Sequence, residues 1–136
     1  MKITSYFNLL FIFFIVLYSC SDKEPIIGKW DDCIKLATKA VEFNATADSV
    51  TIKTGGTCWW ISGVSVDDNY FSNFVGVNIE ADSYVIKQDC FVVERRDKNT
   101  LFIKVNENPL SVQRIITIGL EAGDYFDGVT ITQKSK

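Results

Sequence analysis

Hydrophobic and polar side chains alternate along most of the chain beyond residue 40, and this period of two restricts the fold more than any other feature. Residues 48–53 read DSVTIK and residues 100–105 read TLFIKV, so each segment places its aliphatic side chains on one face of an extended strand. Valine, isoleucine, threonine and aromatic residues fill these runs, and turn-forming residues bound them. The same features predict further strands at residues 33–37, 39–44, 58–64, 84–87, 91–95, 115–120 and 128–133.

The short length and close spacing of these strands indicate how they pack. About nine strands, with turns roughly every 8–12 residues, are typical of an antiparallel sandwich or barrel. Glycines in residues 54–57 (TGGT) and 122–124 (AGD) supply the backbone freedom that hairpin turns demand. No window of twelve residues after the leader shows convincing helical periodicity. The sequence therefore predicts an all-β, antiparallel β-sandwich of about 7–9 strands.

The N-terminal residues have the order of a bacterial export signal. Lys2 precedes the uncharged run 9–18 (LLFIFFIVLY), and the small residues Ser19 and Cys20 follow it. The run is too short for a membrane span, which needs roughly 20 apolar residues. An ordinary secretory signal with a chance cysteine, or a short signal anchor, is the alternative interpretation.

The cleavage region also resembles the lipobox of bacterial lipoproteins, in which a cysteine thiol receives a diacylglycerol group. Leu17 and Ser19 stand at the two informative places before Cys20. We therefore expect a signal peptide at residues 1–19, a lipidated tether at 20–29 and one folded domain at 30–136. Lipid attachment at Cys20 would hold the protein on a membrane of the cell envelope by its acyl chains.

The residue types argue against several classes of function. The chain has no histidine, so it lacks the usual general base and the commonest metal ligand. Its net charge is −3 and its basic residues are dispersed, which argues against nucleic acid as a partner. No nucleophile motif occurs, and nothing fixes two of the acidic residues across a cleft. We expect no catalytic residue, no metal and no cofactor.

Three cysteines remain once Cys20 is assigned to the lipid: Cys33, Cys58 and Cys90. Their spacing matches no zinc or redox motif of the CxxC type. At most one disulfide can form among them, and export makes one plausible. Buried free thiols, which behave as small hydrophobic groups, are the alternative. The sequence does not identify a pair.

Four short segments carry a resemblance to a known family. The first comprises residues 41–43 and 50–52, and the second comprises residues 59–61 and Val64. The third comprises residues 97–105, Asn108 and Arg114, and the fourth is residues 129–133, which end in Gln133. Taken together over residues 40–136, they resemble the BACON-type domains of surface lipoproteins and polysaccharide-degrading systems in Bacteroidetes. The resemblance implies an immunoglobulin-like sandwich and, from the neighbours of such domains in multidomain enzymes, carbohydrate binding. No enzyme domain follows here, so a glycan-binding lipoprotein, a subunit of a surface complex and a spacer all remain open.

Two details fit the same setting. Residues 21–24 (SDKE) resemble the acidic tether that directs lipoproteins of that phylum to the outer face, although a plain polar tether is the alternative. Residues 48–50 resemble its three-residue acceptor for protein O-glycosylation, which makes Ser49 the candidate attachment site. We expect an outer-membrane protein, lipid-anchored and exposed at the cell surface.

Trp59 and Trp60 are the best candidates for contact with a ligand. Successive side chains of a strand point to opposite faces, so one indole enters the core and the other cannot. Tyr70 and Phe71 lie nearby in the long polar segment 65–82, and loops of that length are often functional. Either the second indole contacts a ligand or partner, or segment 65–82 covers it as a lid.

These observations predict a non-catalytic envelope lipoprotein with one β-sandwich binding module. In the first hypothesis, the module contacts carbohydrate or glycoprotein through exposed aromatic side chains, with Trp59 or Trp60 and Tyr70 as the main contacts. In the second, it is a structural or assembly subunit that docks a surface protein and has no small-molecule ligand.

Overall fold

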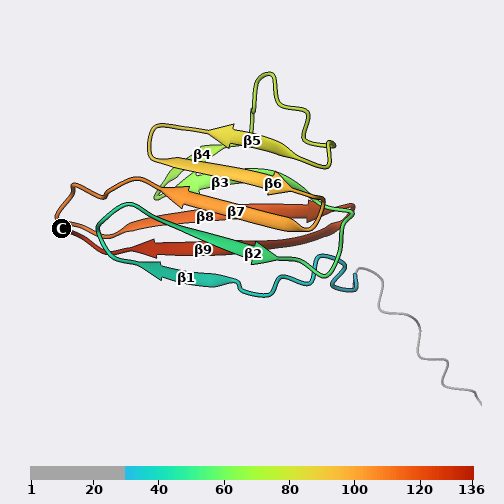
Figure 1. Cartoon of the computed structure of the whole chain (residues 1–136), viewed down its shortest axis with the longest axis horizontal. Helices are drawn as coiled ribbons and strands as arrows, with labels where there is room; N and C mark the ends of the chain where they lie inside the picture. The colour runs from blue at the N-terminus through green and yellow to red at the C-terminus, as the bar shows by residue number, and fades with distance from the viewer. Residues whose placement is uncertain (1–29) are drawn as a thin grey trace, which may run out of the picture.

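The computed structural model describes residues 30–136, which form two stacked β-sheets whose strand axes are nearly aligned (Figure 1). The expectations for residues 1–29, including lipid attachment at Cys20, lie outside the described residues. The strands are β1 (Ala40–Phe43), β2 (Asp48–Lys53), β3 (Trp60–Val66), β4 (Asn69–Phe71), β5 (Tyr84–Lys87), β6 (Phe91–Arg96), β7 (Thr100–Val105), β8 (Arg114–Ala122) and β9 (Tyr125–Gln133).

The strand order confirms the predicted all-β sandwich. One sheet has five strands in the order β1-β9-β8-β3-β4, and the other has four in the order β2-β7-β6-β5. All neighbours are antiparallel except β1 and β9, which are parallel. This division of the strands between two sheets, with crossovers from one sheet to the other, is that of an immunoglobulin-like fold. Within residues 30–136 there is no helix long and apolar enough to cross a membrane.

The core consists of the inward-facing side chains of both sheets. Alternate residues of β7 and β8 are fully buried, and these are Leu101, Ile103 and Val105 of β7 and Ile116, Ile118 and Leu120 of β8. Burying one such side chain contributes about 1.5–3 kcal/mol, so these alternating positions fix which face of each strand turns inward.

A buried polar network closes the end of the sandwich at which β9 ends. Gln133 is completely buried, and its Nε2 donates to the carbonyls of Ala45, Thr46 and Asn106 at 3.2, 3.1 and 3.0 Å. Its Oε1 accepts a hydrogen bond from Arg114 Nη1 at 3.2 Å. Asn108, also completely buried, donates from Nδ2 to the carbonyls of Val112 and Lys134. Asn108, Arg114 and Gln133, which were among the residues that carry the family resemblance, therefore share one structural network.

Residues 33–37 do not form the strand that their sequence predicts. Asp32 Oδ1 accepts hydrogen bonds from the backbone N–H groups of Ile34 and Lys35 at 3.1 and 2.7 Å, which bends the chain. Lys35 has a positive φ of 55°, so the backbone cannot remain extended there. Within residues 33–37, one isolated β-bridge occurs, between Leu36 and Thr54.

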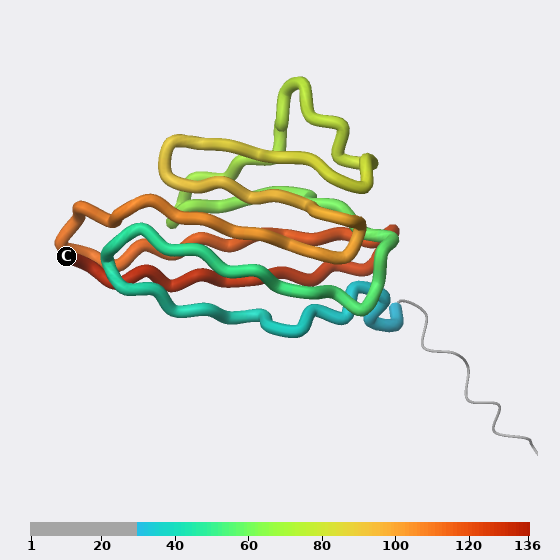
Figure 2. Tube along the Cα trace, in the orientation of Figure 1, coloured from blue at the N-terminus to red at the C-terminus, as the bar shows by residue number. Residues whose placement is uncertain are grey.

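Part of the segment between β4 and β5 projects beyond the edge strands (Figure 2), while Phe74, Val77 and Ile79 within it pack against the core. Residues 71–79 (FSNFVGVNI) contain no charged residue, and Val75 is 86% exposed. Gly76 has a φ of 78°, which an L-residue rarely adopts. β4 itself was not predicted, because only three residues of this polar segment pair, and they pair with β3.

Candidate functional site

The two adjacent tryptophans lie in opposite environments, as their positions in an extended segment predict. Trp59 is only 1% exposed and belongs to the core. Its Nε1 donates to Thr54 Oγ1 at 2.9 Å and to the Gly56 carbonyl at 3.1 Å. The Arg95 guanidinium lies 4.8 Å from the centroid of its ring, a cation–π contact. Trp59 therefore offers no exposed face to a ligand, and Trp60 is the candidate contact.

Trp60 begins a row of side chains on the outer face of the five-stranded sheet. It pairs with Glu121 of β8, and Glu121 pairs with Phe126 of β9. Because Ile61 and Leu120 next to them are fully buried, this row points away from the core. Trp60 is half-buried, whereas Phe126 is 65% exposed. Neighbouring strands lie about 4.8 Å apart, so Trp60 and Phe126 are separated by roughly 10 Å.

A row of three glycines lies beside these side chains. Gly63, Gly119 and Gly128 face one another across β3, β8 and β9. A Cβ added at Gly63 would lie 2.2 Å from Tyr70 Oη, so the tyrosine ring reaches across the sheet onto this glycine. Tyr70 is 67% exposed. The missing side chain at Gly63 therefore makes room for an aromatic ring that stays open to solvent.

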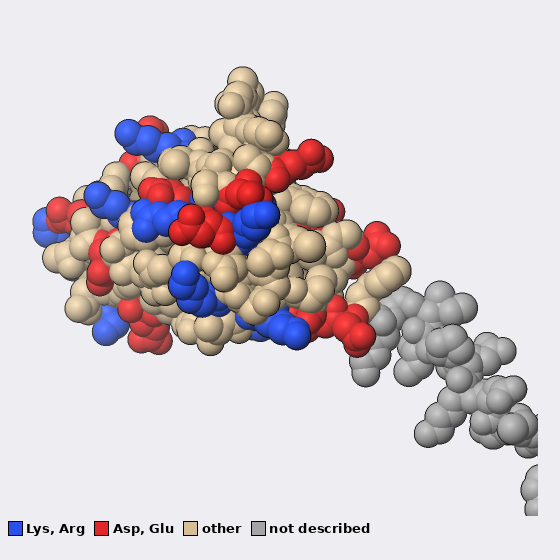
Figure 3. All heavy atoms as spheres, turned by 45° about the vertical axis from the view of Figure 1, so that its right-hand side comes forward, with Lys and Arg blue, Asp and Glu red and all other residues tan. Residues whose placement is uncertain are grey.

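This outer face differs in charge from the face of the other sheet. Its outward-facing residues are Ala40, Glu42, Trp60, Ser62, Gly63, Ser65, Tyr70, Ile115, Thr117, Gly119, Glu121, Phe126, Gly128, Thr130 and Thr132. Only the two glutamates among them are charged. The outer face of the four-stranded sheet instead mixes acidic and basic groups, as Figure 3 shows, and these include Lys53, Lys87, Glu94, Arg96 and Lys104. We call the first surface the aromatic face and the second the charged face.

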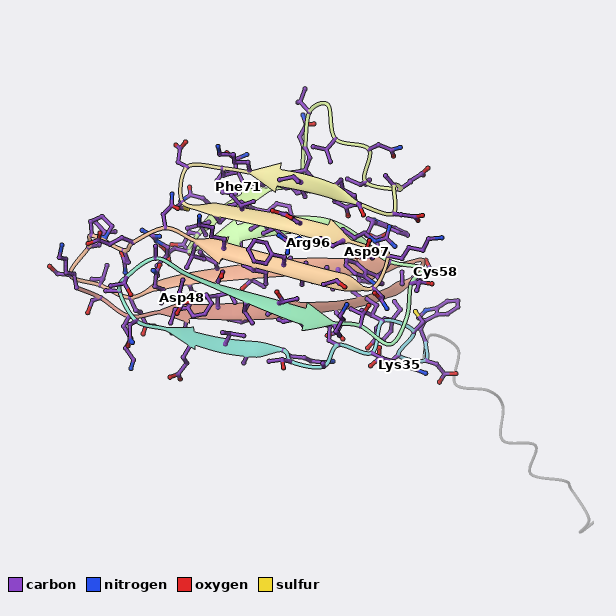
Figure 4. All side chains as sticks on the ribbon, in the orientation of Figure 1. Lys35, Asp48, Cys58, Phe71, Arg96 and Asp97 are labelled. Atoms are coloured by element: carbon purple, nitrogen blue, oxygen red, sulfur yellow. The ribbon has the colours of Figure 1, made fainter. Side chains whose placement is uncertain are left out.

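A cleft of about 410 Å³ adjoins Trp60 at one end of the sandwich. It is lined by Thr57, Cys58, Trp59, Trp60, Ile79, Glu80, Asp82, Arg95 and Lys98. Figure 4 places Cys58 at this end, and Asp48 at the opposite one. The last residues of the segment between β4 and β5 thus lie beside Trp60 but leave it half-exposed, which is an intermediate outcome between the expected lid and a fully open indole.

A second cleft, of about 630 Å³, lies on the charged face and has no aromatic lining residue. It is lined by Lys87, Gln88, Asp89, Val92, Lys104 and Asn106. Arg96 on this face ion-pairs with Glu94 at 2.6 Å, and its guanidinium lies 3.8 Å from the centroid of Phe102. We therefore regard the aromatic face, with the adjoining cleft, as the candidate site, although it does not contain the largest cavity.

The structure corrects a second expected contact, Phe71, in addition to Trp59. Phe71 points inward, with its ring centroid 6.1 Å from that of Phe91 in an edge-to-face arrangement, and it packs against the core. Tyr70 and Phe71 are successive strand residues, so they occupy opposite faces. Phe126 and Glu121 were not among the expected contacts. Gly128 points outward because its neighbour Val129 points inward. Side chains alternate along a strand, so Phe126, two residues before Gly128, points outward as well, and the sequence pattern could have shown this.

The remaining sequence candidates lie elsewhere. Ser49 is exposed on β2, opposite Lys104, and its backbone N–H donates to Asp48 Oδ1 at 2.7 Å. It therefore belongs to the charged face. Cys33 and Cys58 are exposed and Cys90 is half-buried, and all three are free thiols. Burial raises the pKa of the Cys90 thiol. Within residues 30–136, no group of three histidine, cysteine or acidic residues is arranged to hold a metal ion.

Comparison with known proteins adds a likeness of fold. No family model matches the chain, and no curated protein matches it. Its structure is similar to the NMR structure of a protein from Bacteroides thetaiotaomicron, with a TM-score of 0.64 and 19% sequence identity. The match covers 82% of this chain and 95% of the other. At this identity, the likeness shows the β-sandwich fold alone.

Proposed function

We propose that this protein is a non-catalytic lipoprotein of the BACON type whose β-sandwich binds a glycan on the aromatic face. The observation that carries this proposal is the pairing of Trp60, Glu121 and Phe126 in one outward-facing row, with exposed Tyr70 on the same face. Sugar rings have apolar C–H faces that stack on exposed aromatic rings, and their hydroxyl groups bond to carboxylate and hydroxyl oxygens. Both kinds of group occur together on this face.

The location is proposed from the N-terminal sequence. A lipid on Cys20 would anchor the chain to the outer membrane, and residues 21–29 would separate the anchor from the domain. A binding module held in this way would act on glycans that reach the cell surface.

The proposal is tested by a glycan array with the chain expressed from residue 21. We expect binding that is lost in Trp60→Ala and in Tyr70→Ala. Phe102→Ala is the matched control, because Phe102 is an aromatic side chain on the charged face. Binding that survives both aromatic-face substitutions, or that Phe102→Ala removes, would show that the aromatic face is not the glycan site.

A second candidate function, assembly with a surface protein, is supported by the segment between β4 and β5. This segment carries no charged residue over 72–79, and Val75 within it is 86% exposed. Figure 3 shows an uncharged projection at the top of the molecule. An exposed apolar side chain on a projecting segment suits contact with another protein. A blank glycan array, together with a co-purifying protein that is lost in Val75→Asp, would favour this function over the first.

A further inference from the structure

We infer that the ligand of the aromatic face is an extended, uncharged glycan that lies across the strands, with alternate sugar units on Trp60 and Phe126 and the unit between them bonded to Glu121. This inference rests on the proposed function and specifies its ligand class. It follows from the spacing of the row, from its charge and from the free carboxylate at its centre.

The spacing of the row sets the direction and the shape of the ligand. Trp60 and Phe126 lie two strands apart, so their backbone positions are separated by roughly 10 Å along the direction perpendicular to the strands. This distance matches the length of a disaccharide unit in an extended chain. Consecutive units of such a chain would meet Trp60, Glu121 and Phe126 in turn. A single sugar would reach only one of the two rings.

The glycines beside the row have no side chain that would project from the sheet next to Tyr70. Gly63 and Gly119 carry no Cβ, and the space that these atoms would fill is taken by Tyr70 Oη and Ser62 Oγ. The bulge between Ile61 and Gly63 places both Ser62 and Gly63 opposite Gly119. A chain on the row therefore meets a flat tyrosine and a serine hydroxyl along one side, and both suit an uncharged ligand.

The charges of the aromatic face disfavour an acidic ligand. Glu42 and Glu121 are its charged residues, and no lysine or arginine within β1, β3, β4, β8 or β9 points outward from it. Two lysines near the ends of these strands are already paired. Lys39 Nζ lies 2.7 Å from Asp127 Oδ2, and Lys98 Nζ lies 3.3 Å from Asp82 Oδ2. A uronate or sulfate group on the row would approach Glu121 without a cation to offset the repulsion.

Glu121 is the residue that selects the middle sugar. No side chain among residues 30–136 is hydrogen-bonded or ion-paired to its carboxylate, although aromatic residues flank it on both sides. Its two oxygens are free to accept hydrogen bonds from vicinal hydroxyl groups, and bonds to a charged acceptor are about twice as strong as neutral ones. It acts as a specificity residue, since the same charge that attracts hydroxyl groups repels carboxylates.

The test is isothermal titration calorimetry with the chain expressed from residue 21. The probes are neutral gluco-, xylo- and manno-oligosaccharides of increasing length, and oligogalacturonides of matched length. We expect neutral chains of three or more units to bind, and affinity to rise steeply between the monosaccharide and the trisaccharide. We expect no detectable binding of the galacturonides.

Variants connect these results to the residues. Phe126→Ala should lower the affinity for the trisaccharide about tenfold and leave any affinity for the monosaccharide unchanged. Glu121→Gln should lower the affinity for neutral chains about fivefold and reduce the discrimination against galacturonides. Phe102→Ala is the control for loss of an aromatic side chain, and circular dichroism confirms that each variant is folded.

Three results would overturn the inference. Tighter binding of galacturonides than of neutral chains would contradict the charge argument, and full affinity of Phe126→Ala would contradict the spacing argument. Either result, with binding still lost in Trp60→Ala, would leave the proposed glycan function in place. Failure of both probe classes to bind would overturn the inference and the proposed function together.

Discussion

Substitution of the two adjacent tryptophans should separate a core residue from a surface residue. Trp59→Ala would leave a cavity and remove the hydrogen bonds from Nε1 to Thr54 Oγ1 and the Gly56 carbonyl. Replacing a buried tryptophan by alanine costs about 3–5 kcal/mol. The whole domain is expected to be stable by about 5–15 kcal/mol, so this variant should lose a large fraction of its free energy of unfolding.

The milder variant Trp59→Phe gives a measurable intermediate. It keeps an aromatic ring under Arg95 and removes the indole N–H, while Thr54 Oγ1 still donates to the Gly56 carbonyl at 2.7 Å. We expect a cost of about 2 kcal/mol from the lost hydrogen bond and the smaller ring. Trp60→Ala should cost about 1 kcal/mol or less, because its side chain is half-exposed on the outer face.

Urea denaturation followed by far-ultraviolet circular dichroism measures these differences without relying on tryptophan fluorescence. The urea concentration at the midpoint should decrease in the order wild type, Trp60→Ala, Trp59→Phe, Trp59→Ala. The slope of the unfolding free energy against urea concentration should be the same for all four proteins. If Trp60→Ala were as destabilised as Trp59→Ala, the assignment of one indole to the core and the other to the surface would be wrong.

Four further predictions concern other parts of the domain. Gln133→Leu should lose about 3 kcal/mol of unfolding free energy, because three backbone carbonyls and Arg114 lose a buried partner; a wild-type urea midpoint would contradict this. The pKa of Asp32 is lowered, mainly by the hydrogen bond from the Lys35 N–H. The ionised carboxylate therefore stabilises the folded state above its ordinary pKa of 3.8, and this stabilisation is lost as the pH falls through the lowered pKa of the folded state. The Tm difference between wild type and Asp32→Ala should therefore narrow on acidification below about pH 4, and a constant difference would refute the assignment. Cys33 and Cys58 should react rapidly with a thiol reagent and Cys90 slowly, whereas three equal rates in the chain expressed from residue 21 would contradict the burial of Cys90. Gly63→Ala should reduce glycan affinity as much as Tyr70→Ala does while the domain stays folded, because the new Cβ must displace the tyrosine ring; unchanged affinity would show that the position of Tyr70 does not matter.

The strands could be predicted from the sequence wherever one face is buried. Residues 48–53, 84–87 and 100–105 were predicted with the bounds that the structure shows, because their alternation is regular and turns bound them. Residues 33–37 were assigned wrongly, since Asp32 captures two backbone N–H groups and this local bond outcompetes the strand. β4 could not be predicted, because its pairing with β3 and not its own composition makes it a strand.

The candidate site was predicted only in part. The alternation of strand residues gives the opposite environments of Trp59 and Trp60, but not which of the two is buried. The sequence also does not bring Trp60 next to Glu121 and Phe126, residues more than sixty positions away, because that contact depends on the register of β3 with β8. A bulge between Ile61 and Gly63 shifts this register, and a hydrophobic pattern does not reveal a bulge in advance.

Chemical-shift mapping by NMR tests most directly whether the aromatic face is the binding surface. In a titration of the ¹⁵N-labelled chain with a neutral oligosaccharide, we predict the largest changes at the Trp60 indole N–H and at the backbone amides of Glu121 and Phe126. The amides of Lys87 and Lys104 on the opposite sheet should not move. Changes concentrated on that opposite sheet, or on residues 72–79, would contradict the account.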